Sequence, residues 1–262
     1  MQLSIIIPAK DEAENIVPLL EEVRTAFGDS TEWEVLVVDD GSSDDTPRRL
    51  ATLTASGYHQ LRVLRHAASC GQSAALRTGA QAARGAWLGT LDGDGQNDPA
   101  DLARLWHELR LLQQPPAMWI GHRAMRHDNA VRKFSSRIAN GVRSRVLGDG
   151  VPDTGCGLKL IRRDVFLSLP YFDHLHRFLP ALVRREGLTV RSVRVSHRPR
   201  LRGTSKYGVN NRLWVGIVDM LGVLWLLRRR RLPALEAALA ERSLVAGHPL
   251  VRSGAQIGEP SQ

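Results

Sequence analysis

The chain has 262 residues, of which 43% are hydrophobic and 24% are charged, as expected of a globular protein that can bury a substantial core. Its two cysteines, Cys70 and Cys156, exclude a disulfide framework and the usual zinc spacings, which favours a reducing compartment. The net charge of +9 points to anionic partners, namely nucleotide phosphates, anionic lipid or nucleic acid. No basic and apolar leader precedes the first strand-like run, so we expect no signal peptide.

Strand-like and helix-like segments alternate through the first third of the chain. Short aliphatic runs predict buried strands at residues 3–8, 34–40, 61–64 and 86–91. Helical spacing, a Thr-Pro helix start and an Ala-rich run predict helices at residues 11–27, from residue 46, and at residues 72–84. This alternation predicts an α/β protein with a mostly parallel sheet covered by helices on both faces.

Three acid-rich turns follow predicted strands. They are Lys10–Glu12, Asp39–Asp40 and Asp92–Asp94. Because ligands of such sheets bind at the carboxyl ends of the strands, we expect these turns to converge on one site. The first strand is followed by neither a Walker loop nor a Gly-x-Gly-x-x-Gly motif, which disfavours P-loop and Rossmann sites.

The turn after the fourth predicted strand carries two carboxylates, Asp92 and Asp94, on either side of Gly93. Two like charges in a dry site repel each other unless a cation lies between them. A few hard oxygen ligands suit Mg²⁺ or Mn²⁺ that also binds a substrate phosphate. The turn therefore predicts a metal-diphosphate site, and the alternative is an ordinary acidic turn.

Four segments stand in an order that identifies a family. They are Ile5–Asn15, Val37–Thr46, Gly71–Leu76 and Asp92–Pro99. Together they resemble the family 2 glycosyltransferases, and most of all the branch of dolichyl-phosphate mannose synthases and undecaprenyl-phosphate sugar transferases. The resemblance runs from about residue 3 to about residue 230. It implies a GT-A fold, a nucleotide-diphosphate-sugar donor and a polyprenyl-phosphate acceptor.

The resemblance also implies roles for individual residues. The metal ligands would be Asp92, Asp94 and Gln96. The donor-binding positions would be Pro8, Lys10, Glu12, Asp39 and Asp40, together with Asp92. Carboxylates suit this task because they accept hydrogen bonds from ribose hydroxyls and base N–H groups. The chain departs from the family pattern at Lys10, where an aromatic or small polar residue is common, and at Ala68–Cys70, where Asn is common.

The second half of the chain is expected to serve the acceptor. By resemblance, Arg123 and Arg132 match arginines that meet phosphate groups, and the guanidinium fork suits phosphate oxygens. Arg132 lies in a predicted basic helix at residues 129–147, whose alternative interpretation is a solvated charged face. Asp153 matches an acid near the reacting centre. A phosphate acceptor is already an anion, so we expect Asp153 to shape the site rather than act as a base. The predicted catalytic set is thus Asp94, Asp153 and Arg132.

Two further segments are expected to act on the acceptor side. Residues 191–195 alternate in polarity and predict an edge strand. The loop at residues 202–208 resembles the Arg-x-x-Gly-x-Ser-Lys loop of the lipid-phosphate branch. We expect a lid that closes on phosphate through Arg200, Arg202, Ser205 and Lys206, and the alternative is a solvated basic turn.

An apolar run at residues 213–227 is too short for a usual membrane span. As a helix it would extend about 22 Å, and a bilayer core needs about 30 Å. Trp214 and Trp225 together with Arg228–Arg231 predict a helix that lies in the interface of an anionic membrane, and the alternative is a core helix. We therefore expect a catalytic domain at residues 1–211, an interface helix at 212–231, and a short helix and disordered tail at 232–262.

These patterns predict an inverting glycosyltransferase that uses Mg²⁺ or Mn²⁺ and acts peripherally at the cytoplasmic face of the inner membrane. The alternatives are a family 2 enzyme acting on a hydroxyl of a glycan or lipid A-type acceptor, and a nucleotidyltransferase. A nucleic-acid-binding module is disfavoured because the basic helix contains a single aromatic residue, Phe134, on its apolar stripe. The sugar, the nucleotide, the acceptor length and the oligomeric state stay open.

Overall fold

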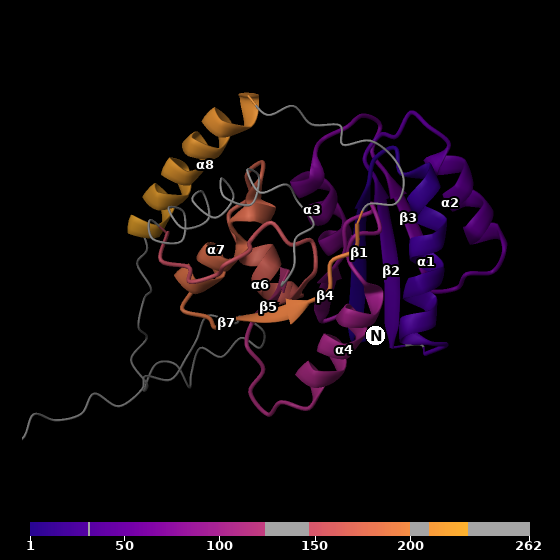
Figure 1. The fold of residues 1–262 in the computed structure, drawn as a ribbon, viewed down its shortest axis with the longest axis horizontal. Helices are drawn as coiled ribbons and strands as arrows, with labels where there is room; N and C mark the ends of the chain where they lie inside the picture. The colour runs from indigo at the N-terminus through magenta and orange to yellow at the C-terminus, as the bar shows by residue number, and fades with distance from the viewer. Residues whose placement is uncertain (31, 124–146, 200–209, 230–262) are drawn as a thin grey trace, which may run out of the picture.

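The computed structural model describes residues 1–30, 32–123, 147–199 and 210–229 (Figure 1). The strands of this part of the chain are β1 Leu3–Ala9, β2 Trp33–Asp39, β3 Leu61–Arg65, β4 Trp87–Thr90, β5 Met118–Arg123, β6 Lys159–Arg162 and β7 Val190–Val195. Its helices are α1 Ala13–Phe27, α2 Thr46–Ala55, α3 Gln72–Ala82, α4 Pro99–Arg110, α6 Arg163–Ser168, η1 Leu175–Arg177, α7 Leu179–Arg185 and α8 Asn210–Arg228. The predicted basic helix lies outside the described residues except for Leu147.

The described strands form one sheet in the order β3-β2-β1-β4-β6-β5-β7. Strands β1 to β4 are parallel to one another, and β7 is parallel to β5. Strand β6 runs antiparallel to both of its neighbours, β4 and β5. The predictions of a mostly parallel sheet and of an edge strand near residues 191–195 are confirmed.

Alternating side chains of β1 face two separate hydrophobic layers. Ile5 and Ile7 belong to the layer that contains α1 and α4, whereas Ile6 belongs to the layer that contains α3. Successive strand residues point to opposite faces, so a run of isoleucines buries both faces of the strand. At Gly79 of α3 a Cβ atom would lie 2.5 Å from a methyl carbon of Ile6, so the glycine allows the helix to approach β1 closely.

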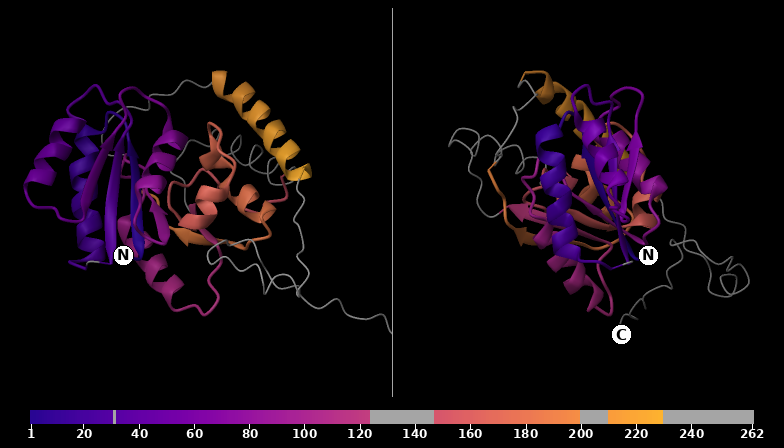
Figure 2. Two further views of the ribbon diagram at one scale, coloured as in Figure 1. Left: turned by 180° about the vertical axis from the view of Figure 1, so that it is seen from behind. Right: turned by 90° about the vertical axis from the view of Figure 1, so that its right-hand side faces the viewer.

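The register places the carboxyl ends of three strands side by side. Ala9 at the end of β1 pairs with Asp39 at the end of β2, and Ile6 pairs with Thr90 at the end of β4. Helices then cover both faces of the sheet and leave this edge for the loops (Figure 2). The sheet therefore brings the three acid-rich turns together.

Helix α8 lies on the outside of α7, at the end of the molecule remote from α2 (Figures 1 and 2). Its inner side packs through the buried Val223, and Arg185 Nε donates a hydrogen bond to the carbonyl of Leu226. Its outer side exposes Val218 and Leu221, by 65% and 57%. Within the described residues, no helix combines the length and the apolarity that crossing a membrane requires.

Candidate functional site

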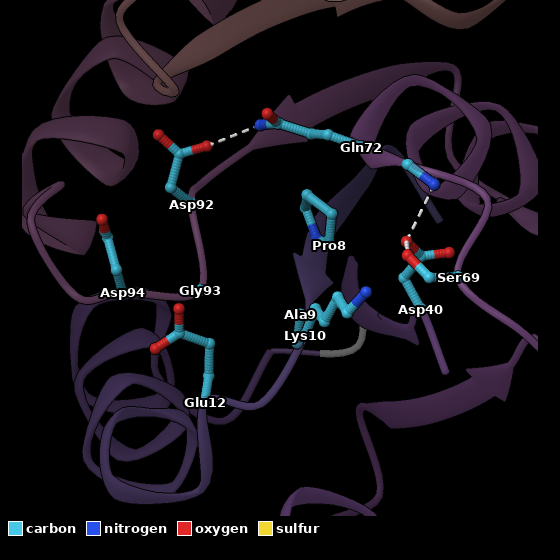
Figure 3. Close-up of a pocket in the computed structure, with 11 residues that line it drawn as sticks. Pro8, Ala9, Lys10, Glu12, Asp40, Ser69, Gln72, Asp92, Gly93 and Asp94 are labelled. Carbon is cyan, nitrogen blue, oxygen red and sulfur yellow. Dashed lines mark hydrogen bonds between the residues drawn. The ribbon is translucent and has the colours of Figure 1, made fainter. Parts of the chain in front are cut away.

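A cavity of about 420 Å³ opens at the carboxyl ends of β1, β2 and β4 (Figure 3). Its wall is formed by Pro8, Ala9, Lys10, Glu12, Asp40, Ser69, Gly71, Gln72, Asp92, Gly93 and Asp94. All three acid-rich turns contribute to this wall, as does the loop that precedes α3. Four strand-end segments, each brief in sequence, therefore build one concave site.

Asp92 and Asp94 lie on one side of the cavity. Burial, followed by repulsion from Asp94, raises the pKa of Asp92 to about 6. Gln72 holds one oxygen of Asp92 through a hydrogen bond of 2.9 Å (Figure 3). Two hard carboxylates at the wall of a cavity form a donor set that fits a divalent cation, and a cation there would relieve their repulsion.

The segment before β6 packs closely onto Asp92. A Cβ atom on Gly157 would overlap the carboxylate of Asp92 and the amide oxygen of Asn97. Asn97 Oδ1 accepts a hydrogen bond of 3.2 Å from the amide of Asp92, and Thr90 Oγ1 donates to the carbonyl of Gly157. Glycine is thus required at position 157 for a close approach, because any larger residue would push the Asp92 carboxylate aside.

Asp40 organises the loop on the opposite side of the cavity. Its carboxylate accepts hydrogen bonds from the amides of Cys70 and Gly71 at 2.8 and 2.9 Å, and from Ser69 Oγ at 2.8 Å. His66 Nδ1 lies 2.7 Å from the same carboxylate. Burial by itself would raise the pKa of Asp40, but these hydrogen bonds lower it below its usual value. Asp40 is therefore an anion that fixes the loop.

Asp40, His66 and Cys70 place potential metal-ligand atoms within 4.8 Å of one another. Each nitrogen of His66 already has a partner, because Nδ1 contacts Asp40 and Nε2 lies 3.0 Å from Thr78 Oγ1. The Asp40 oxygens are also fully engaged by the loop. A metal would have to replace these contacts, so the cluster fits a hydrogen-bonded turn better than a metal site.

Asp39 lies behind the cavity wall and does not line the cavity. It is fully buried, and its Oδ1 accepts a hydrogen bond of 2.9 Å from the amide of Ser42. Its Oδ2 has no hydrogen-bond partner, although Arg65 Nε lies 3.1 Å away as an ion-pair partner. Arg65 thus balances the charge of this buried oxygen, and Asp39 stays outside the cavity lining.

Gln96 lies outside the cavity lining. Its backbone amide donates a hydrogen bond of 3.1 Å to Asp94 Oδ1, which fixes the acidic turn. Its side-chain nitrogen lies 3.4 Å from the carbonyl of Arg198. The structure thus brings Asp92 and Asp94 to the cavity but directs the amide nitrogen of Gln96 toward the segment after β7.

Arg123 and Asp153 form a bidentate ion pair. Arg123 Nε and Nη2 donate to the two oxygens of Asp153 at 2.6 and 2.8 Å, and both side chains are largely buried. Arg123 ends β5, and Asp153 lies in the segment before β6. The two residues were predicted to act separately, on phosphate and at the reacting centre, whereas the structure joins them directly.

Five predicted residues fall outside the described part of the chain. Arg132 belongs to residues 124–146, and Arg200, Arg202, Ser205 and Lys206 belong to residues 200–209.

Sequence reasoning missed several residues that support the site. Gln72 had a signal, because it lies within the recognised segment Gly71–Leu76, but that segment was given no site role. Gly157 and Lys159 had no sequence signal other than the glycine-rich segment in which they lie. Lys159 is buried next to Asp92 and Asp153, and its ammonium donates to the carbonyl of Cys156. Burial lowers the pKa of Lys159, and the neighbouring acids oppose that effect.

Comparisons with known proteins agree with this geometry. Residues 4–169 match the family described as "Glycosyl transferase family 2". The chain is 32% identical over 237 residues to a dodecaprenyl-phosphate galacturonate synthase of Rhizobium johnstonii, covering 89% of this chain and 69% of that protein. It is 30% identical over 207 residues to an undecaprenyl-phosphate 4-deoxy-4-formamido-L-arabinose transferase of Photorhabdus laumondii, covering 79% of this chain and 63% of that protein.

Solved structures share the fold. Glucosyl-3-phosphoglycerate synthase of Mycobacterium tuberculosis, in complex with Mn²⁺, UDP-glucose and glycerol 3-phosphate, superimposes with a TM-score of 0.64 at 20% identity. The match covers 86% of this chain and 79% of that one. A second complex of the same enzyme, with Mn²⁺, UDP and phosphoglyceric acid, gives a TM-score of 0.65 over 88% of this chain and 79% of that one, at 20% identity. The predicted GT-A fold is confirmed.

Proposed function

The chain belongs to glycosyl transferase family 2, and on that basis we propose that it transfers a sugar from a nucleotide-diphosphate sugar to a polyprenyl phosphate. The observation that carries the proposal is the strand-end cavity whose wall combines Asp92 and Asp94 with the loop fixed by Asp40. The names of the two relatives support the acceptor class, because both describe transfer to a polyprenyl phosphate.

The donor would occupy the cavity with its diphosphate next to Asp92 and Asp94. These carboxylates would hold a divalent cation, which when bound neutralises charge on the departing diphosphate. Both Mg²⁺ and Mn²⁺ suit two carboxylate ligands, and the Mn²⁺ of the structural neighbour supports a divalent metal in general. On the nucleoside side, Lys10, Glu12 and Asp40 line the wall, and the fully buried Asp39 supports the wall from behind.

The reaction needs little proton transfer. An oxygen of the lipid phosphate forms the new bond to the anomeric carbon, and the electron pair of the broken bond leaves with the nucleotide diphosphate. Attack from the face opposite the leaving group inverts the anomeric centre. The phosphate is already ionised, so no base has to remove a proton. The pairing of Asp153 with Arg123 supports a positioning role for this acid over that of a general base.

A membrane-bound acceptor requires access to lipid, and α8 offers an apolar outer side for it. The exposed fractions are 37% for Val215, 65% for Val218, 57% for Leu221 and 58% for Trp225. Exposed apolar side chains next to arginines suit a helix that lies on an anionic bilayer. Arg228 and Arg229 are exposed at the end of the helix, and Arg229 lies 5.7 Å from the ring centre of Trp225.

The proposal includes peripheral association with the cytoplasmic face of the inner membrane. It keeps the division into a catalytic domain at residues 1–211 and an interface helix at 212–231, although the helix itself begins two residues earlier, at Asn210. Residues 232–262, predicted to form a short helix and a tail, lie outside the described part of the chain.

A donor screen tests the proposal. Purified protein is incubated with vesicles that contain undecaprenyl phosphate, with Mg²⁺ or Mn²⁺, and with a panel of nucleotide sugars. One donor should yield a glycosyl phospholipid, and a chelator should stop the reaction. Transfer to a glycan or lipid A hydroxyl, with none to the lipid phosphate, would contradict the proposed acceptor and favour a hydroxyl-directed enzyme.

A further inference from the structure

Two histidines near η1 point to different neighbours. His176 Nδ1 lies 2.8 Å from Ser73 Oγ in the first turn of α3, and the backbone amide of His176 lies 3.3 Å from the same oxygen. His174 Nδ1 lies 3.0 Å from Asp219 Oδ2 in α8. One short segment therefore connects α3 with α8, two helices that are far apart in sequence.

The contact on the α3 side lies next to the cavity. Ser73 is fully buried, and it directly follows Gln72, which lines the cavity and donates a hydrogen bond to Asp92. A hydrogen bond at the first turn of a helix fixes the position of that turn. The contact between His176 and Ser73 thus joins η1 to the helix turn that carries Gln72.

The contact on the α8 side uses an acid, Asp219, within the apolar run at residues 213–227. Asp219 lies midway along α8, and its side chain is 18% exposed. A carboxylate among apolar residues is costly unless it is paired, so the helix is most stable when Asp219 meets His174. Because Asp219 faces the domain, the exposed Val218 and Leu221 face away from it.

The backbone of His174 is strained in a way that fits this link. Its φ angle is +62°, in the left-handed region that few non-glycine residues adopt. Asp173 Oδ1 accepts a hydrogen bond of 2.8 Å from the His174 amide, which supports this conformation. Such conformations persist where the surrounding structure requires them. Here the conformation places two side chains, two residues apart, against two different helices.

We infer that His174 and Asp219 are positioning residues, which set the orientation of the lipid-facing helix relative to the metal carboxylates. The inference rests on the proposed function and deepens it. The link aligns the bilayer surface with the cavity, so that a phosphate at the membrane surface arrives near the anomeric carbon. A dissolved acceptor can approach freely and gains nothing from this alignment.

The test compares two acceptors with the donor identified by the screen. One is undecaprenyl phosphate in anionic vesicles, and the other is geranyl phosphate in solution. Asp219→Ala removes the link, and so does His174→Asn, since asparagine tolerates the left-handed backbone. Asp219→Asn retains an oxygen that accepts a hydrogen bond. The matched control is His107→Asn, at an exposed histidine of α4.

For the vesicle acceptor, kcat/KM should fall about tenfold in Asp219→Ala and His174→Asn, because a misplaced acceptor loses its alignment with the donor. For geranyl phosphate it should stay within about twofold of wild type, since no alignment is involved. Asp219→Asn should keep most of the wild-type kcat/KM with the vesicle acceptor, and His107→Asn should match wild type. An equal loss with both acceptors, or no loss with vesicles, would overturn the inference.

A second measurement does not depend on turnover. Hydrogen exchange of vesicle-bound protein should show faster deuterium uptake in α8 and η1 for Asp219→Ala and His174→Asn, with β1 and β2 unchanged. Unchanged uptake in α8 would overturn the link itself. If wild type transferred no sugar to either acceptor, the proposed function would fail, and the exchange data would still decide whether His174 and Asp219 orient the helix.

Discussion

The donor side and the acceptor side of this molecule are held together by different means. On the donor side, the parallel ladders of β1, β2 and β4 align the acidic turns at one edge of the sheet. On the acceptor side, pairs of side chains join distant segments, such as Arg123 with Asp153 over 30 positions and His174 with Asp219 over 45.

This difference indicates how each side responds to substitution. A main-chain ladder survives the loss of one side chain, so donor-side variants should lose chemistry while they keep the fold. A geometry that depends on single side-chain pairs has no such support. Acceptor-side variants should therefore change orientation and specificity first, and five experiments ranked by expected effect test this contrast.

The largest effect is expected at the metal carboxylates. Asp94→Asn removes one charge and no volume, so kcat/KM should fall about 10³-fold with an unchanged melting temperature. The control is Asp29→Asn, at an exposed acid remote from the cavity. A chelator should stop wild-type turnover, and Mg²⁺ or Mn²⁺ should restore it. Full activity in the chelator would remove the metal from the proposal.

The close approach at Gly157 should rank second. Gly157→Ala places a methyl group against the Asp92 carboxylate, which should lower kcat/KM about 10²-fold through a displaced ligand. The concentration of Mn²⁺ at half-maximal rate should rise as well. Gly222→Ala serves as the control, because nothing lies within 4 Å of the added methyl group. An unchanged metal dependence would show that Gly157 does not set the position of Asp92.

The ion pair on the acceptor side should rank third. Asp153→Asn weakens the hold on Arg123, and we expect a loss of about tenfold in kcat/KM, well below that of Asp94→Asn. In the same assay Arg132→Ala should lower kcat/KM more than Arg163→Ala does. The guanidinium of Arg163 donates a hydrogen bond to the carbonyl of Ala80 and so supports the fold. If Asp153→Asn were the most damaging variant, a hydroxyl acceptor and a general base would be the better interpretation.

The outer side of α8 should matter for membrane binding rather than for chemistry. The double variant Leu221→Ser and Trp225→Ser should lower the partition coefficient onto anionic vesicles at least about tenfold, because less apolar area leaves water. Replacing Arg228 or Arg229 by Gln should weaken the free energy of binding to anionic vesicles by about 1 kcal/mol for each arginine, and high salt should mask this loss. The control is Leu111→Ser, at a residue 72% exposed elsewhere on the surface. Equal binding by all variants would exclude α8 as the lipid contact.

The smallest effect concerns pH and His176. Burial, and then the nearby charge of Lys159, lowers the pKa of His176 well below 6.5. The folded state keeps the ring neutral, whereas the unfolded chain takes up a proton below about pH 6.5. The free energy of unfolding should therefore decrease as pH falls from 7 to 5, by at most about 1.4 kcal/mol per pH unit from this group.

Urea midpoints at pH 7 and 5.5 measure this pH dependence. His176→Gln should flatten the curve, whereas His107→Gln, at an exposed site, should leave the slope unchanged. An identical slope in His176→Gln would show that another group causes the loss of stability in acid.

The sequence by itself determined the donor side of this protein. Aliphatic runs buried on both faces identify parallel strands, and the acids that follow them must gather at one edge, because parallel strands end on the same side. Asp40, Asp92 and Asp94 line the cavity for this reason. The apolar run from Leu213 likewise identified a helix, although the sequence left open whether that helix lies in a membrane interface or in the core.

Only the tertiary structure decided the acceptor side. Arg123 meets Asp153, and His176 meets Ser73 across 103 positions, and no local pattern records such contacts. On the donor side, the contact of Gly157 with Asp92 is equally absent from any local pattern. These contacts depend on the antiparallel insertion of β6 between β4 and β5, and on the packing of η1 and α8. Local periodicity encodes which face of an element is buried, whereas the partner of that face is chosen by the packing of the whole chain.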